Sequence, residues 1–305
     1  MKTQLTRSQV IVPMVSPFCA DYSIDVDAVG RMCTMFADAG VSVFVLGTTG
    51  EGDSLSDEQR ETLLGCVVKE LKGRSKIFAG LAGNSLTQSI RDSEKYYDLG
   101  ADYLVAKLPA YYPMNDTQML LFLEKLADSV SLPLFIYNIP ATTHHSIPLQ
   151  IAEKLSYHPN ILGMKDSERN LERLEASIRL WGKRDDFDFL IGWAAMSAAG
   201  LLKGANGIVP STGNLYPDLY VQMINAVREG NEKAALELQE KTDRISALYQ
   251  KERTLSQSIP ALKTMMKMKG LCSGEVLPPM LTMSKNEEDI FLAEVKNELE
   301  ILNVL

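Results

Sequence analysis

The stretch VSVFVLG at residues 41–47 is a short apolar run with little polar alternation, which is typical of a strand buried on both faces. Strand and helix patterns alternate eight times over the first 215 residues or so, because amphipathic segments such as Asp116 to Val130 separate eight such runs. This alternation predicts an α/β fold, and it favours a (β/α)8 TIM barrel rather than a doubly wound sheet. The other runs are VIVPMV near 10–15, KIFAGLA at 76–82, DYLVAK at 102–107, LPLFIY at 132–137, ILGMK at 161–165, FDFLIG at 187–192 and NGIVPS at 206–211.

The ends of several helices are also marked in the sequence. Ser56 with Gln59 forms a capping box, and Ser284 with Glu287 forms another. A glycine precedes the strand in AGVSVFV, LGADYLV and KGANGIV, where it can adopt the left-handed conformation that ends a helix. From about residue 217 the pattern is helical with no strand between the helices. We therefore expect the barrel over residues 1–216, and the last barrel helix with a C-terminal helical extension of the same domain over 217–305.

The composition is that of an ordinary globular protein of 305 residues, with 46% hydrophobic residues. The 31 Lys and Arg against 39 Asp and Glu give a net charge of −8, so we expect no nucleic acid and no anionic membrane as partner. No apolar run approaches the roughly 18 residues of a membrane span, and the start MKTQLTRSQVIVP shows no signal peptide. The four cysteines lack CxxC spacing, which favours free thiols and a cytoplasmic location.

Barrel enzymes carry their active sites at the C-terminal ends of the strands, and Lys165 is the most informative residue there. It ends an apolar run, so its ammonium should point into the barrel mouth. An amine in partly dry surroundings is more easily neutral and can then attack a carbonyl, as a Schiff-base lysine must. The alternative is a strand-end lysine that is exposed or paired with Asp166.

Two other strand ends could assist such a lysine. Tyr137 ends the strand at 132–137, and a phenol beside an ammonium can shuttle protons to a substrate oxygen. A lone tyrosine at such a position is more often a packing residue. The turn at 47–50 offers backbone N–H groups and the hydroxyls of Thr48 and Thr49, enough to hold a carboxylate or phosphate oxygen. Two glycines around two threonines could also make a plain tight turn.

Other kinds of site have little support. His144 and His145 are adjacent and would point apart, and no HxH, HExxH or carboxylate cluster occurs at the strand ends, so we expect no metal. The turn at 47–50 lacks the GxxxxGK spacing of a P-loop, no GxGxxG follows a strand, and no GxSxG is present. We therefore expect neither a nucleotide site nor a serine hydrolase.

Several features occur in a familiar order: GTTGE at 47–51, P-x-YYP at 109–113, YNIP at 137–140, a lysine about 28 residues after the tyrosine of YNIP, and then a G-x-x-x-S stretch. With them the chain resembles the dihydrodipicolinate synthase / N-acetylneuraminate lyase family over nearly its whole length. Members of that family are class I aldolases on a (β/α)8 barrel. They are usually homotetramers, built as dimers of dimers, and act on pyruvate or related 2-oxo acids without a separate cofactor.

The resemblance implies a role for each matching residue. Lys165 would form the Schiff base and Tyr137 would shuttle protons. Thr48 and Thr49 would bind the carboxylate of the 2-oxo acid, and one of them would relay protons. Tyr111 resembles the tyrosine that reaches into a neighbouring subunit's site to complete that relay. Residues that resemble supports of the turns are Asn138, Pro140 and Glu51.

The positions that select the second substrate depart from both named subfamilies. The synthases have an arginine two residues after the YNxP proline to hold the aldehyde's carboxylate, whereas Thr142 stands here and cannot make a bidentate charged contact. The sialic-acid lyases have an Asp-Glu pair after the glycine of strand seven, whereas Gly192 is followed here by Trp193, Ala194 and Ala195, without the two acids. His144 stands where many relatives have glycine, as a pocket residue or merely a loop residue near the rim. We expect an unusual second-substrate pocket formed by Thr142, His144, Trp193, Val209 and Ser211.

The leading hypothesis is a lyase that reversibly cleaves or condenses a 2-oxo acid, with pyruvate as the covalent partner. Its second substrate would be an aldehyde, of which a deoxy-sugar acid is one example. The alternatives within the family are dihydrodipicolinate synthase with a substitute for the missing arginine, and a dehydratase or deaminase. A non-catalytic binding protein on an aldolase scaffold is the alternative from a different class.

Overall fold

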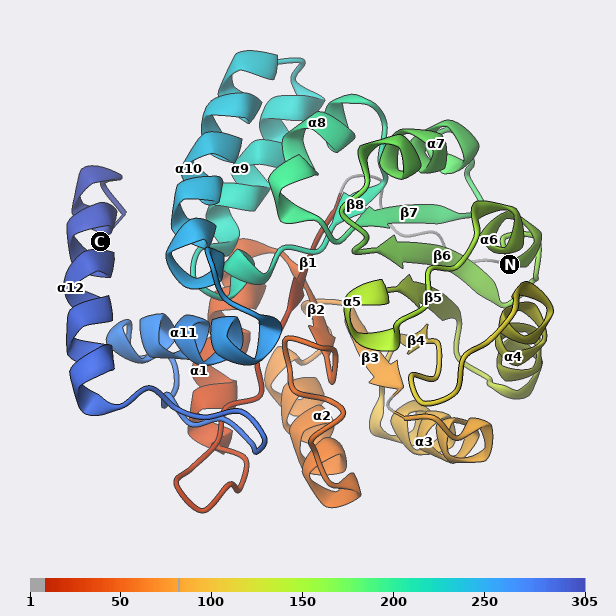
Figure 1. The fold of residues 1–305 in the computed structure, drawn as a ribbon, viewed down its shortest axis with the longest axis horizontal. Coiled ribbons are helices and arrows are strands. Elements are labelled where there is room, and N and C mark those ends of the chain that lie inside the picture. Colours follow the sequence, from red (N-terminus) through yellow and green to blue (C-terminus); the bar gives the residue numbers. More distant parts are fainter. Residues whose placement is uncertain (1–8, 82, 305) are drawn as a thin grey trace.

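The computed structural model describes residues 9–81 and 83–304, and its centre is a closed barrel of eight parallel strands in sequential order (Figure 1). Each of the eight predicted strands is found. Residues 1–8, 82 and 305, which the sequence analysis placed at the start of the barrel, in the third strand and in the helical tail, lie outside the described residues. The strands are β1 (Gln9–Pro13), β2 (Ser42–Val45), β3 (Ile77–Leu81), β4 (Tyr103–Lys107), β5 (Leu134–Asn138), β6 (Ile161–Asp166), β7 (Asp188–Ile191) and β8 (Gly207–Ile208).

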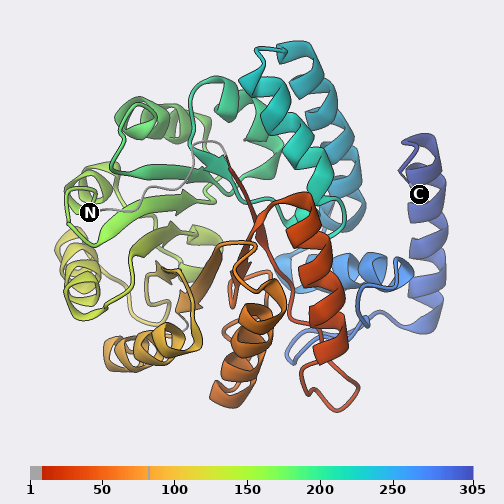
Figure 2. The same ribbon diagram turned by 180° about the vertical axis from the view of Figure 1, so that it is seen from behind.

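Helices follow the strands and surround them, so the fold is the predicted TIM barrel (Figures 1 and 2). The predicted helix signals are confirmed: both arms of the capping box of Ser56 are present, and Gly40 and Gly100 end their helices with φ of 69° and 99°. The helices of this layer are α1 (Val26–Ala39), α2 (Asp57–Leu71), α3 (Leu86–Leu99), α4 (Asp116–Ser129), α5 (Pro140–Thr143), α6 (Leu149–Leu155), α7 (Leu171–Trp181), α8 (Ser197–Leu202) and α9 (Pro217–Arg228), with 3-10 turns at Ala194–Met196 and Ser211–Asn214.

Three further helices follow the barrel: α10 (Glu232–Gln250), α11 (Leu255–Met268) and α12 (Lys285–Ile301). α10 packs against α8 and α9, and α12 packs against α10 and α11. Both views place α12 at the periphery of the molecule, away from the strands (Figures 1 and 2). The capping box of Ser284 and Glu287 begins α12, as predicted. No helix in the described ranges is long and apolar enough to cross a membrane.

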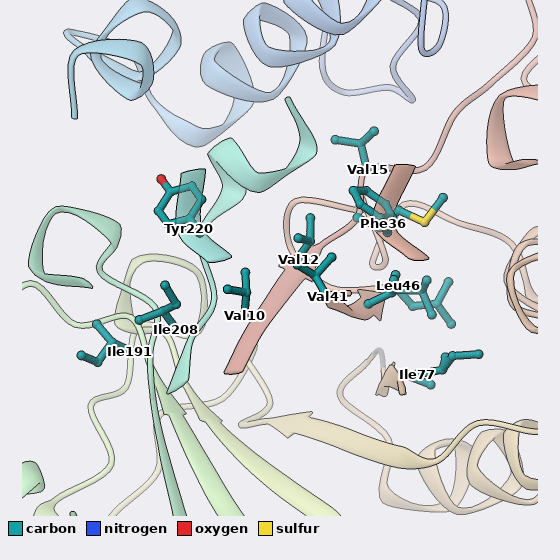
Figure 3. Packing of buried hydrophobic residues seen from close by; sticks show 14 of the residues in the cluster. Val10, Val12, Val15, Phe36, Val41, Leu46, Ile77, Ile191, Ile208 and Tyr220 are labelled. Atoms are coloured by element: carbon teal, nitrogen blue, oxygen red, sulfur yellow. The ribbon is translucent and has the colours of Figure 1, made fainter. Parts of the chain in front are cut away.

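The strands separate two apolar cores. On β1, Val10 and Val12 belong to the core between the strands and the helices, which Figure 3 shows together with Phe36 and Tyr220. Ile11, which lies between the two valines, belongs instead to the core inside the barrel. This alternation follows from the period of two in a strand, and burial of both faces explains why the strands read as nearly continuous apolar runs.

The core inside the barrel is rich in aromatic rings. Phe78 stacks on Tyr103 with ring centroids 4.7 Å apart, and Phe135 meets both rings edge-on. Gly163 of β6 faces Phe135 in the neighbouring strand β5, and a Cβ atom at residue 163 would lie 2.4 Å from the ring of Phe135. The strand that carries Lys165 can therefore approach Phe135 closely only because residue 163 has no side chain.

Candidate active site

A cavity of about 490 Å³ opens at the C-terminal ends of the strands. The ends of β2, β5, β6 and β7 and the segment after β8 meet around this cavity, as expected of strand ends in a barrel. Helices α10 and α11 with their connection cover the remaining side. The sequence-predicted residues that line the cavity are Thr48, Thr49, Tyr137, Lys165, Trp193, Val209 and Ser211.

Lys165 is buried, with 6% of its surface exposed. Its Nζ lies 4.1 Å from the centre of the Tyr137 ring and 4.8 Å from that of Phe44. The described chain gives this ammonium no carboxylate partner, since Asp166 is bound instead by Arg173, with 2.6 Å between Arg173 Nε and Asp166 Oδ2. The alternative of an exposed or Asp166-paired lysine is therefore wrong. The two ring faces stabilise a positive charge on Nζ.

The register of the sheet makes Tyr137 the direct neighbour of Lys165 on the adjacent strand. The phenol is buried, and its hydroxyl accepts a hydrogen bond from Ser167 Oγ at 3.4 Å. Its ring meets Phe44 edge-on at 6.3 Å. An amine and a phenol are thus held side by side on rigid strands, as proton transfer to a substrate on the lysine requires.

A buried polar network fixes these two strand ends. Asn138 donates to Asp166 Oδ1 at 3.1 Å and to Glu168 Oε2 at 2.9 Å, and its own oxygen accepts the N–H of Ile147. Burial raises the pKa of the Asp166 carboxyl, and the guanidinium of Arg173 opposes that rise. The network joins β5 to β6 directly behind Tyr137 and Lys165. Arg173 lies in an ordinary amphipathic helix, and no sequence signal pointed to its role.

The turn after β2 holds Thr48 and Thr49, both half-buried, at the edge of the cavity. Glu51 donates its N–H to the carbonyl of Thr48 at 3.1 Å and has φ of 56°, so the chain doubles back sharply. A Cβ at Gly50 would lie 2.7 Å from the carbonyl oxygen of Met14. The second glycine of the motif is thus required by the close approach of two backbones.

Lys263 of α11 completes this turn from the other end of the chain. Its ammonium donates hydrogen bonds to Glu51 Oε1 and, at 2.7 Å, to the carbonyl of Glu275. It also lies 4.3 Å from the centre of the Phe18 ring. The N–H of Leu277 donates to Glu51 Oε2 at 2.7 Å. Burial raises the pKa of Glu51 and lowers that of Lys263, and their ion pair opposes both shifts. The available signal was a lysine within the apolar helical segment SIPALKTMM.

Ser211 belongs to a hydroxyl network that the sequence analysis missed. Tyr249 OH lies 2.7 Å from Ser211 Oγ and 2.8 Å from Thr212 Oγ1, and it accepts from Gln250 Nε2 at 2.9 Å. Burial raises the pKa of the Tyr249 phenol. Tyr249 and Gln250 end α10 and line the cavity, but no feature of that helical pattern marks them.

Three predicted residues do not line the cavity of this single chain. Tyr111 is 76% exposed in the loop after β4 and packs edge-on against Tyr112. Thr142 is half-buried, with its hydroxyl 3.4 Å from the carbonyl of Ile139. His144 is exposed and ends α5 with φ of 60°, a conformation that glycine adopts more easily. The relay role of Tyr111 and the substrate-binding roles of the other two residues stay predictions.

Within residues 9–81 and 83–304, no group of three or more His, Cys, Asp or Glu side chains is placed to hold a metal ion. The absence of a metal or cofactor in the active protein stays a prediction. The groups that the cavity does offer are the amine of Lys165, two phenols, several hydroxyls, the carboxylate of Glu168, and the guanidinium groups of Arg169 and Arg253.

The fold and the site define a (β/α)8-barrel enzyme, a carbon–carbon lyase of the aldolase type. The chain belongs to the dihydrodipicolinate synthetase family, whose model matches residues 6–298. It is 30% identical to the 4-hydroxy-tetrahydrodipicolinate synthase of Xanthomonas campestris over 232 residues, 76% of each chain. Among solved structures, the dihydrodipicolinate synthase of Bacteroides thetaiotaomicron has a TM-score of 0.91 at 29% identity, covering 97% of this chain and all of that one. The E. coli K12 prophage protein YagE, solved in complex with pyruvate, has a TM-score of 0.90 at 26% identity, covering 98% and 99%.

Proposed function

We propose that this lyase works through a Schiff base between Lys165 and a 2-oxo acid, of which pyruvate is the simplest, with an aldehyde as the second substrate. The observation that carries the proposal is the buried ammonium of Lys165, which has no ion-pair partner in the described chain and lies against the ring of Tyr137. The pyruvate complex of the related YagE supports the choice of the 2-oxo acid.

In the proposed reaction the neutral amine of Lys165 attacks the keto carbon, and the adduct loses water to give an iminium. The iminium withdraws electrons, so the adjacent carbon loses a proton and becomes an enamine that attacks the aldehyde carbon. Water then hydrolyses the iminium and frees the lysine; cleavage is the reverse. Tyr137 moves protons to and from the substrate oxygen. The faces of Tyr137 and Phe44 stabilise the cationic nitrogen of the iminium.

The carboxylate of the 2-oxo acid is proposed to bind at Thr48 and Thr49. These two residues supply hydroxyls and backbone N–H groups at the cavity's edge, and the turn that holds them is fixed by Glu51 and Lys263. A neutral donor set suits a carboxylate here, because the adjacent iminium already supplies a positive charge.

The proposal includes a homotetramer in which Tyr111 of one subunit completes the proton relay of another, with no separate cofactor. The exposure of Tyr111 in the single chain suits a residue that contacts a second copy. Light scattering after gel filtration measures the assembly, and a monomeric, fully active protein contradicts it.

A cytoplasmic location is also part of the proposal, and free thiols at all four cysteines favour it.

The test of the Schiff base is reductive trapping. The protein is incubated with pyruvate and borohydride, digested, and analysed by mass spectrometry. We expect the reduced pyruvyl adduct on Lys165 and its loss in Lys165→Arg. Absence of any label, while a control aldolase is labelled in parallel, contradicts the mechanism.

A synthase of the dihydrodipicolinate type is the second candidate, favoured by the name of the Xanthomonas relative. An aldehyde panel that includes aspartate semialdehyde, with pyruvate consumption as the readout, distinguishes the two. Efficient use of the semialdehyde would assign the synthase reaction despite Thr142.

A further inference from the structure

Two arginines stand at the mouth of the active-site cavity. Arg169 lies in the connection between β6 and α7, four residues after Lys165, and Arg253 lies in the connection between α10 and α11. Both line the cavity that contains Lys165, and both also line a shallow hollow on the outer surface. Arg169 donates from Nη2 to Gln250 Oε1 at 3.5 Å, which joins the β6–α7 connection to the end of α10. Both guanidinium groups thus belong to the lining of the cavity that holds Lys165.

The charges around the cavity do not balance. Its charged lining residues are Lys165, Arg169, Arg253 and Glu168. The Glu168 carboxylate is occupied, because it accepts from Asn138 at 2.9 Å and from Ser146 at 2.6 Å. The cavity is thus positive in a chain of net charge −8. A concave site of one sign concentrates ligands of the other sign.

In the proposed function, the first substrate does not use this excess charge. Once the Schiff base forms, the iminium on Lys165 and the carboxylate of the 2-oxo acid cancel each other. Within the cavity lining, the two guanidinium groups are then left without a counter-charge of their own. A second anionic group, belonging to the other substrate, would restore the balance.

Both guanidinium groups have N–H donors to spare. Arg253 donates from Nη1 to the carbonyl of Leu248 at 2.9 Å, and its guanidinium lies 5.1 Å from the centre of the Phe291 ring, a contact that limits its motion. In the described chain neither Arg169 nor Arg253 has a carboxylate within ion-pair distance. Two acidic residues, Asp243 and Glu252, also border the outer hollow, but neither forms an ion pair with these arginines. Asp243 accepts a hydrogen bond from Gln239 at 2.8 Å, and Glu252 is exposed. A guanidinium with free N–H groups is suited to a carboxylate or phosphate.

We propose that Arg169 and Arg253 form an anion subsite that selects an aldehyde with a carboxylate or phosphate at the end remote from its carbonyl. The inference rests on the proposed function for the identity of the reaction. In this proposal the β6–α7 and α10–α11 connections supply the positive charge that the synthases take from the arginine at the position of Thr142. The aldehyde carbon then faces the enamine on Lys165 while the anionic end stays at the rim.

Matched aldehydes test this subsite by steady-state kinetics with pyruvate. Succinic semialdehyde is compared with butanal, and glyceraldehyde 3-phosphate with glyceraldehyde, so the two pairs tell carboxylate from phosphate. For the preferred anion we expect kcat/KM about 10- to 100-fold above that of the neutral match. In Arg169→Gln and Arg253→Gln this preference should shrink about tenfold or more, mainly through KM. Arg179→Gln, an exposed arginine of α7 outside the cavity, is the control and should keep it.

A binding measurement separates this proposal from the mechanism. Isothermal titration calorimetry with glutarate, an inert dianion, and with neutral glutaramide requires no catalysis. Arginine-dependent binding of glutarate without pyruvate trapping on Lys165 would leave the subsite standing and remove the Schiff base. Glutarate that binds equally to the wild type and to both arginine variants would overturn the subsite, as would equal kcat/KM for charged and neutral aldehydes. Arg169 is exposed, so Arg169→Gln should fold even if Arg253→Gln does not.

Discussion

The ammonium of Lys263 is hydrogen bonded to the carboxylate of Glu51, although 212 residues separate the two in the chain. Both side chains are completely buried. Glu51 belongs to the turn that carries Thr48 and Thr49, and Lys263 belongs to α11, beyond the last barrel helix. The C-terminal extension therefore holds one wall of the active site in place as well as covering it.

Replacing Lys263 by methionine should lower the free energy of unfolding by about 3–5 kcal/mol, because the buried carboxylate of Glu51 is left unpaired. Urea unfolding followed by fluorescence measures the change. Lys267→Met is the matched control one turn later on the same helix: its ion pair with Glu288 leaves the lysine side chain 50% exposed, so the loss should stay below about 1 kcal/mol. Equal losses in the two variants would contradict a structural role for the buried pair.

Replacing Arg173 by methionine should make stability fall as the pH rises. Burial already raises the pKa of Asp166, and without the guanidinium that pKa rises further. Between the unfolded and folded pKa values the folded protein then binds a proton that the unfolded chain releases, so its free energy of unfolding decreases with pH. We expect a loss of about 3–5 kcal/mol near neutral pH and a smaller one near pH 5.

Unfolding curves at about pH 5 and about pH 8 check the predicted direction of the change. The free energy of unfolding should fall between these two pH values by more in Arg173→Met than in the wild type. Arg179→Met, an exposed arginine on the same helix, serves as the control. A variant that becomes more stable relative to the wild type at the higher pH would show that the burial of Asp166 does not dominate its titration.

The strands could be predicted from the sequence because they are buried on both faces, so that each one is a nearly continuous run of apolar residues. Their ends were less certain. The last run was predicted over 206–211, but β8 covers only Gly207–Ile208. Pro210 lacks the N–H that a ladder needs, and the chain turns into a 3-10 helix at Ser211. A short strand suffices here because β1 and β7 hold it on both sides.

The strand-end residues of the site could also be predicted, because a barrel brings all its strand ends to one mouth. Tyr249, Arg253 and Lys263 could not, since their place depends on how the extension folds back over that mouth. Nor can one chain place Tyr111, whose expected partner is a second subunit. Local patterns encode strands and helices, whereas these contacts depend on the packing of distant segments.

Gly163→Ala should destabilise the protein by roughly 1–3 kcal/mol, because the new methyl group would lie 2.4 Å from the Phe135 ring and 2.5 Å from the carbonyl oxygen of Asp188. Gly65→Ala in α2 is the counterpart. Its methyl group would meet Leu99 at an ordinary 3.7 Å, and alanine favours a helix, so stability should rise by about 0.5–1 kcal/mol. Thermal and urea unfolding of both variants measure the two changes, and a stable Gly163→Ala protein would show that β5 and β6 can move apart.

Tyr137→Phe should reduce kcat by roughly 10²–10⁴ while the fold is kept, because the substitution removes only the hydroxyl. The ring still faces Lys165, so the cation–π contact at 4.1 Å survives and the loss reports proton transfer alone. Ser167→Ala is the control: it removes the 3.4 Å hydrogen bond to the phenol, a long and weak one, and should cost much less. Single-turnover kinetics with pyruvate and an aldehyde measure both variants. If Tyr137→Phe keeps near-normal turnover, the phenol is a packing residue and another group must carry the proton.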